Sequence, residues 1–317
     1  MKINLKTFID IVSDCQRRDL TINSMAVQFE DWEQFKITKC PHLVVDPFQG
    51  QADIFCKVLV HTSDAFAEDP VRVLRIARFA ARYDFTIQKV TMDLMKEIVH
   101  ELNHVPTERI FAEFEKGLME EHPHIMIDVL RLVGAFEVEV MKPFHRDRSL
   151  WQRPCRVESL KKAGHIKHLP SRFALIGTGF TAEEFKSHRI PNDCAEMSAI
   201  INKFVEKLAW FHIFTKSDRL NVIMEIRAMQ RSEEFIHRMF DIVDILFDRG
   251  CTIHREQFLK DLRCIKKVDA ASIASDVKAT FNPDNIWDIG TTIKWAIFNA
   301  RLDSMDIGKH PMFVPGQ

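Results

Sequence analysis

An acidic residue followed by a row of arginines is the part of this sequence best suited to chemistry. Asp69 is a favoured helix N-cap and Pro70 fits the first helical position, so a helix is predicted to begin here. Helical spacing then places four arginines on one face: Arg72, Arg75, Arg78 and Arg82. Like charges at this spacing repel one another, and guanidinium groups match phosphate oxygens. The row therefore favours a bound anion, such as a nucleotide phosphate or an RNA backbone; a solvated basic surface is the alternative.

A second charged motif, Arg17-Arg18-Asp19, precedes Leu20 near the start of the chain. Arg18 could hold a triphosphate, and the carboxylate of Asp19 could accept hydrogen bonds from ribose hydroxyls. The alternative is a charged loop closed by an Arg–Asp pair.

A turn is predicted between these two motifs, at Asp46-Pro47-Phe48-Gln49-Gly50. Pro47 fixes φ there, and Gly50 is free to take positive φ. We interpret the segment as a strand connection, with structural rather than catalytic roles for Asp46 and Asp53.

Helices should dominate the remaining architecture, because glycine (10) and proline (12) are sparse among 317 residues. Short strands are expected at Met25–Phe29, Leu43–Val45 and Ile54–Val60. Helical periodicity predicts helices at 70–83, 90–102, 107–120 and 123–134, and residues 157–317 also have a helical pattern. The fold class expected is mainly α, with a small α/β portion at the front.

Taken together, the three motifs closely resemble those of the bacterial-type CCA-adding tRNA nucleotidyltransferases, whose relatives include the bacterial poly(A) polymerases. The resemblance continues through Phe79-Ala80-Ala81-Arg82-Tyr83 and Pro106-Thr107-Glu108-Arg109-Ile110. It implies a truncated nucleotidyltransferase head remnant (1–67), a helical neck with a nucleotide-selecting motif (68–141), and a helical body and tail (142–317).

The resemblance also implies roles for individual side chains. Asp69 and Arg72 would select CTP or ATP at the hydrogen-bonding edge of the base. The other nucleotide-binding residues implied are Arg18, Asp19, Arg75 and Arg78. The alternative for Asp69 is an N-cap beside an intrahelical ion pair.

The sequence departs from the family pattern in two places. It contains neither a Gly-Gly-x-x-Arg-Asp segment nor the Asp-x-Asp pair that binds two Mg²⁺ ions in the family. We therefore expect Mg²⁺ only together with a missing head segment, and no nucleotide transfer by this chain alone. Near 172–180, Thr178 and Gly179 stand where some family members carry the His-Asp pair of a phosphohydrolase, so that activity is expected to be lost.

The function expected is the nucleotide-selecting and tRNA-binding portion of a CCA-adding enzyme, with CTP and ATP as substrates and the tRNA 3′ end as partner. A separate head polypeptide or self-association would cover the truncated sheet. The alternatives are a non-catalytic tRNA- or RNA-binding protein, a poly(A) polymerase-like enzyme, and a helical interaction module.

Composition limits where the chain can act. A net charge of −1 means that any RNA-binding surface must be local, and the stretches at 161–172 and 260–267 are basic enough to contribute. No run of 18 apolar residues occurs, and the seven cysteines form no C-x-x-C pair. We therefore expect a cytoplasmic protein with no membrane partner.

Overall fold

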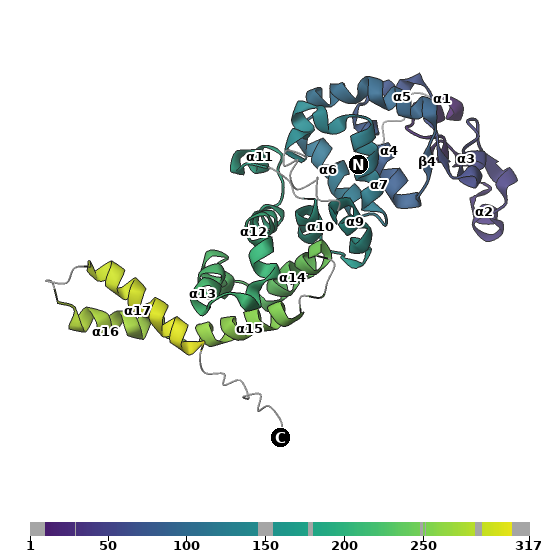
Figure 1. Ribbon diagram of the computed structural model, residues 1–317. Coiled ribbons are helices and arrows are strands. Elements are labelled where there is room, and N and C mark those ends of the chain that lie inside the picture. Colours follow the sequence, from purple (N-terminus) through teal and green to yellow (C-terminus); the bar gives the residue numbers. More distant parts are fainter. Residues whose placement is uncertain are drawn as a thin grey trace. The chain divides into compact units, whose positions relative to one another are not determined.

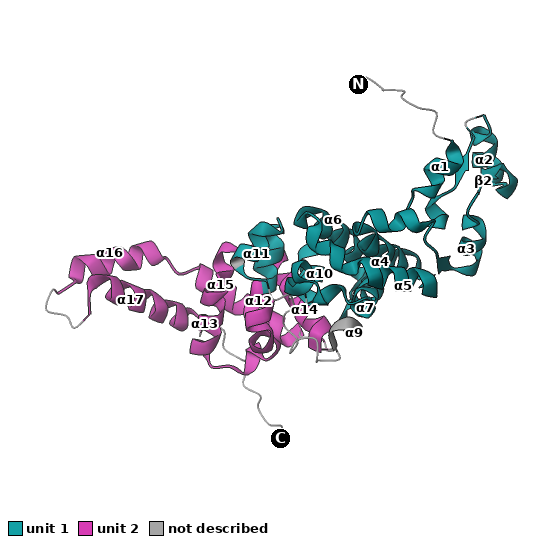
Figure 2. Cartoon of the chain, turned by 90° about the horizontal axis from the view of Figure 1, so that it is seen from above, with its two compact units in different colours: residues 1–198 teal, residues 199–317 magenta. Residues whose placement is uncertain are grey.

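The computed structural model describes residues 10–28, 30–144, 155–176, 180–247, 250, 252–282 and 287–305. Helices make up most of these residues, which confirms the expectation of a mainly α protein (Figure 1). The chain forms two compact units, residues 1–198 and 199–317 (Figure 2). The predicted division at residue 142 stays a prediction about the organisation of the sequence.

Short elements form the front of unit 1. They are α1 (Ile11–Gln16), β1 (Ala26–Val27), α2 (Trp32–Thr38), β2 (Val44–Val45), α3 (Gly50–Cys56), β3 (Val58–Leu59) and β4 (Thr86–Ile87). Strands β1 and β2 pair antiparallel, with Ala26 opposite Val45. Strands β3 and β4 pair parallel, with Val58 opposite Thr86. The strands expected at Met25–Phe29 and Leu43–Val45 are thus present in shortened form.

The strand expected at Ile54–Val60 is wrong over its first three residues, which belong to α3. A helix begins at Gly50 because the Asp46 carboxylate accepts hydrogen bonds from two backbone N–H groups, those of Gly50 (2.7 Å) and Gln51 (2.8 Å). Positive φ falls on Gln49 (63°) rather than on Gly50. Asp46 therefore caps a helix, in keeping with a structural role.

Position 50 requires glycine because of close packing, and not because of its backbone conformation. A Cβ at this position would lie 2.3 Å from the carbonyl oxygen of Thr21. The hydroxyl of Thr21 also donates to the Asp53 carboxylate (2.6 Å). These contacts join α3 to Thr21, two residues after Asp19, and they are in keeping with a structural role for Asp53 as well.

Four helices that match the predicted periodicity closely form the centre of unit 1. They are α4 (Val71–Tyr83), α5 (Lys89–Ile98), α6 (Thr107–Leu118) and α7 (Pro123–Leu132), and a 3-10 segment, Val99–His104, follows α5. Helix α4 packs against both α6 and α7. Its apolar face is buried through Val73, Leu74, Ile76, Ala77, Ala80 and Ala81. Burial of each large side chain contributes about 1.5–3 kcal/mol, so this face holds the arginine face in position.

A buried arginine closes the carboxyl end of α6. Arg172 lies on α10 (Leu169–Leu175). Helix α9 (Cys155–Lys162) precedes α10 in the sequence, and α11 (Ala182–Ser187) and α12 (Asn192–Ala209) follow it. The Arg172 guanidinium donates to four carbonyl oxygens, those of Leu118, Glu120, Gly164 and Ile166. Burial lowers the pKa of this guanidinium. Thr178 and Gly179 lie outside the described residues, so the expected loss of the His-Asp pair stays a prediction from sequence.

Unit 2 contains the end of α12 followed by α13 (Lys216–Glu225), α14 (Glu233–Phe247), α15 (Thr252–Lys266), α16 (Ala270–Thr280) and α17 (Ile289–Ser304). Phe258 contacts the rings of Phe211 and Phe240 in its core, at centroid distances of 4.9 and 5.4 Å. Nearby, Arg219 forms a buried ion pair with Asp261 (2.8 Å). Within the described ranges, no helix is long and apolar enough to cross a membrane.

Candidate nucleotide-binding site

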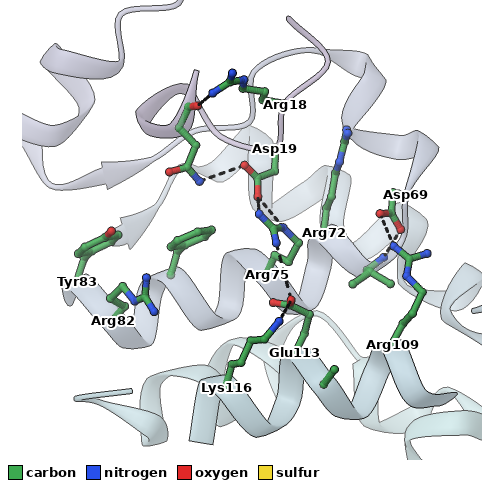
Figure 3. Close-up of a pocket in the computed structure, with 14 residues that line it drawn as sticks. Arg18, Asp19, Asp69, Arg72, Arg75, Arg82, Tyr83, Arg109, Glu113 and Lys116 are labelled. Carbon is green, nitrogen blue, oxygen red and sulfur yellow. Dashed lines mark hydrogen bonds and ion pairs between the residues drawn. The ribbon is translucent and has the colours of Figure 1, made fainter. Parts of the chain in front are cut away.

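A cavity of about 780 Å³ lies beside α4 and α6 in unit 1 (Figure 3). Its lining consists of Arg18, Asp19, Asn23, Asp69, Val71, Arg72, Arg75, Phe79, Arg82, Tyr83, Arg109, Ala112, Glu113 and Lys116. Six of these side chains are cationic and three are acidic. The lining therefore carries an excess of positive charge, which suits a polyanion such as a nucleoside triphosphate.

The centre of the cavity joins two motifs that lie far apart in the sequence. Asp19, only 6% exposed, accepts from the Arg75 guanidinium through Nε (2.8 Å) and Nη2 (2.7 Å). The other oxygen of this carboxylate accepts from the backbone N–H of Leu20 and the side chain of Asn23. The front loop is thus fixed to α4, and two hydrogen bonds to one carboxylate oxygen set the direction of the Arg75 side chain.

Glu113 on α6, at the floor of the cavity, is the shared partner of several cationic side chains. Its carboxylate accepts from Arg78 (2.9 Å) and Lys116 (2.9 Å) and lies 3.8 Å from Arg75. Burial by itself would raise the pKa of Glu113, but these three cations outweigh burial and hold the pKa below its usual 4.5. Glu113 is therefore a charged residue that fixes α4 to α6.

Asp69 and Arg72, the residues expected to select the base, each have a protein partner. The Asp69 carboxylate pairs with Arg109 of α6 (2.8 Å) and accepts from the backbone N–H of Val71 (3.2 Å). The Arg72 guanidinium donates to the carbonyl oxygens of Ala65 (2.5 Å) and Arg17 (2.6 Å). Helix α4 begins at Val71, one residue later than predicted, and Asp69 caps it from two residues before its first residue. The alternative of an intrahelical ion pair is wrong, because the partner comes from another helix.

Arg109 is one of the charged lining residues that sequence reasoning missed, together with Glu113 and Lys116. It belongs to the Pro106–Ile110 segment that extended the family resemblance, but nothing local indicates a partner 40 residues away. That segment was the available signal, because its arginine lies near the start of a predicted helix.

The structure places Arg18 on the rim and Arg78 away from the cavity. Arg18 donates to Asp14 (2.8 Å) and to the carbonyl oxygen of Asn23 (2.8 Å), so its acidic partner is not the adjacent Asp19. Arg78 is only 7% exposed, pairs with Glu113 and Glu120, and is absent from the lining. Direct contact between Arg78 and a nucleotide finds no support in this geometry, because Glu113 on α6 and Glu120, two residues beyond α6, neutralise it.

The described residues do not fit a Mg²⁺ site. Nowhere in the described ranges do three His, Cys, Asp or Glu side chains gather as they would around a metal ion. The lining acids Asp19, Asp69 and Glu113 each face an arginine instead. We therefore derive no catalytic step through a metal from these residues.

Comparison with known proteins identifies relatives of this chain. Residues 84–143 match the family model described as the probable RNA- and SrmB-binding site of polymerase A. The chain is 31% identical to the multifunctional CCA protein of Methylobacillus flagellatus, over 94% of this chain and 77% of that protein. It is 48% identical to the multifunctional CCA protein of Neisseria meningitidis serogroup B, over 72% of this chain and 60% of the relative.

Solved structures share the fold. The chain superposes on the Bacillus stearothermophilus CCA-adding enzyme in complex with CTP with a TM-score of 0.65 and 17% identity, over 94% of this chain and 71% of that one. The Thermotoga maritima CCA-adding enzyme complexed with tRNA gives a TM-score of 0.53 and 20% identity, over 95% and 71%. These observations define a class of mainly helical proteins with an arginine-lined cavity beside helix α4. The chain belongs to the CCA-adding tRNA nucleotidyltransferase family.

Proposed function

We propose that this chain is the nucleotide-selecting and tRNA-binding portion of a CCA-adding tRNA nucleotidyltransferase, with CTP and ATP as substrates. One observation carries the proposal: Arg18 and Asp19 of one family motif and Asp69, Arg72 and Arg75 of another line a single positively charged cavity. The relatives named above are CCA proteins, which favours CCA addition over poly(A) synthesis.

The chemistry of the bases explains how one site could take both CTP and ATP. Cytosine and adenine each present an amino group beside an unprotonated ring nitrogen on the pairing edge. A carboxylate can only accept and a guanidinium can only donate, so Asp69 suits the amino group and Arg72 suits the ring nitrogen. Uracil and guanine present a carbonyl oxygen beside a protonated nitrogen, so the hydrogen-bond donor and acceptor exchange places. Bidentate base contacts in protein–DNA complexes discriminate by roughly 1–3 kcal/mol, and we expect a similar size here.

Binding would exchange existing bonds for new ones. Arg72 gives up carbonyl oxygens of Ala65 and Arg17, and Asp69 shares its carboxylate between Arg109 and the base. Arg18 and Arg75 remain on the lining to meet phosphate oxygens. Arg78 contributes indirectly, since it holds Glu113 and so the floor of the cavity.

Transfer of a nucleotide also requires Mg²⁺-binding carboxylates, which we propose come from a head polypeptide. Such a polypeptide, or self-association, would cover the exposed side chains near the β1–β2 sheet, such as Trp32 and Ile37. The tRNA 3′ end is the acceptor partner, and the segment matched by the RNA-binding family model supports this assignment.

Calorimetric titration of the full chain with CTP, ATP, UTP and GTP tests the proposal. CTP and ATP should bind roughly 5- to 150-fold more tightly than UTP and GTP. Asp69→Ala and Arg72→Ala should remove this preference. The matched control is Asp93→Ala, which breaks an exposed pair with Lys96 on α5 and should change nothing. Failure of the unchanged chain to bind any nucleotide would refute the proposal; salt-dependent tRNA binding in that case would support a non-catalytic RNA-binding protein instead.

A further inference from the structure

We infer that the end of the cavity formed by Phe79, Tyr83 and Arg82 is a separate stacking subsite for a nucleobase of an RNA 3′ end. All three side chains come from the last turns of α4 and line the cavity. Figure 3 shows Arg82 and Tyr83 at one end and Asp69 with Arg109 at the other. The inference rests on the proposed function, because the RNA would be the acceptor strand of that reaction.

The aromatic rings at this end form a fixed and partly open platform. Phe79 and Tyr83 lie parallel, with an interplanar angle of 3° and a centroid distance of 6.0 Å. Phe85 contacts the Tyr83 ring at 5.5 Å. Phe79 is only 6% exposed, whereas Tyr83, the single tyrosine of the chain, is 44% exposed. The buried ring therefore supports the exposed one, which is free to stack on a planar ligand.

Three guanidinium groups surround this platform. The guanidinium carbons of Arg75, Arg78 and Arg82 lie 5.8, 4.5 and 5.9 Å from the centroid of the Phe79 ring. Glu120 holds Arg82 (2.7 Å), and its hydrogen bond raises the pKa of that guanidinium. Arg82 thus remains charged and oriented beside Tyr83. Aromatic rings next to arginines are the combination that single-stranded nucleic acid requires, since bases stack on the rings and phosphates pair with the cations.

The two ends of the cavity are too far apart to share one base. Val71 and Tyr83, the first and last residues of α4, are 12 residues apart, which corresponds to about 18 Å at the rise of an α-helix, and Asp69 precedes this helix. A volume of about 780 Å³ lies toward the upper part of the range for small-molecule sites. The cavity can therefore hold an incoming nucleotide at the Asp69 end and the terminal base of the acceptor at the Tyr83 end.

A stacking subsite also suits a reaction in which the acceptor changes at each step. When nucleotides are added in turn, the base at the 3′ end is not always the same. Stacking tolerates every base because each has a π-face, whereas hydrogen-bond selection does not. The division of the cavity thus separates a selective end for the nucleotide from a tolerant end for the RNA.

Two substitutions at one position test the subsite. Tyr83→Phe keeps the ring and Tyr83→Leu removes it, while Phe55→Leu alters an exposed aromatic residue on α3 as the matched control. The probe is a fluorescein-labelled RNA hexanucleotide ending in two cytidines. Its binding to the full chain is measured by fluorescence anisotropy. CTP and UTP titrations are run in parallel on every variant.

Tyr83→Leu should weaken hexanucleotide binding roughly 5- to 150-fold, the effect of losing one base–aromatic stack. Tyr83→Phe and Phe55→Leu should match the unchanged chain, and the preference for CTP over UTP should persist in all three, which also reports correct folding. The inference would be overturned if the unchanged chain did not bind the hexanucleotide, or if Tyr83→Leu bound it as tightly as the unchanged chain. Loss of the CTP preference in Tyr83→Leu would overturn it too, since Tyr83 would then belong to the selective end. If the hexanucleotide binds through Tyr83 while no nucleotide binds, the proposed function fails and the subsite stands.

Discussion

Replacement of Glu113 by glutamine should destabilise the packing of α4 against α6, while the arginines that line the cavity stay in place. Glu113 is 8% exposed and Arg78 is 7% exposed, so the variant leaves a buried guanidinium with little compensation. Removing one partner of a buried ion pair costs about 3–5 kcal/mol. We expect about 3 kcal/mol, at the lower end, because Arg78 retains Glu120 at 3.4 Å. Arg75 keeps its ion pair with Asp19.

The effect should also depend on pH. The pKa of Glu113 is depressed in the folded chain, so its contribution is fully present above its ordinary value of 4.5 and disappears as the pH falls through the folded-state pKa. The difference in stability between the unchanged chain and Glu113→Gln should therefore be largest near neutral pH and should shrink below about pH 4.5.

Hydrogen exchange measured by mass spectrometry checks this prediction locally. Peptides from 71–83 and 107–118 should exchange faster in Glu113→Gln, while peptides from 216–225 in unit 2 serve as the internal reference. Glu139→Gln, which breaks an exposed pair with Lys142, should cost less than about 1 kcal/mol. A loss of under about 1 kcal/mol in Glu113→Gln, or a loss that is constant between pH 7 and pH 3.5, would refute the reasoning.

Three further variants probe separate contacts. Arg172→Met should lower the free energy of unfolding of unit 1 by at least about 1–3 kcal/mol, seen in urea denaturation, because buried carbonyl oxygens lose their donor. Gly50→Ala should cost about 1–3 kcal/mol in the same assay, because the added Cβ would meet the Thr21 carbonyl; an unchanged midpoint would contradict this. Arg109→Ala should reduce the preference for CTP over UTP by no more than about fivefold, because its pair with Asp69 is largely exposed and such pairs contribute about 0.2–1 kcal/mol.

Helices α4 to α7 could be predicted from the sequence because their apolar residues recur at helical spacing and clear start signals precede them. Pro106 and Pro123 mark the starts of α6 and α7, as expected. The strand expected at Ile54 was wrong because the Asp46 cap starts a helix, and a hydrophobic run alone does not distinguish these outcomes.

The candidate site was predicted only as far as local pattern allows. The arginine face of α4 was visible from spacing, but its neutralisation was not, since Glu113 and Glu120 come from residues more than 30 positions later. For the same reason the sequence did not separate Arg78, which is buried, from Arg75, which lines the cavity. Pairings between distant charged residues depend on how helices pack, and one sequence contains no direct record of them.

Helix α4 has two faces with different tasks, and this has a thermodynamic consequence. Nine of its 13 residues are buried, while others line the cavity. A ligand that binds only the folded helix stabilises the fold, by about 2.7 kcal/mol when its concentration is 100 times its dissociation constant. Under the proposed function, the melting temperature of unit 1 should thus rise with the concentrations of CTP and ATP, and the lifetime of the folded chain should rise with them.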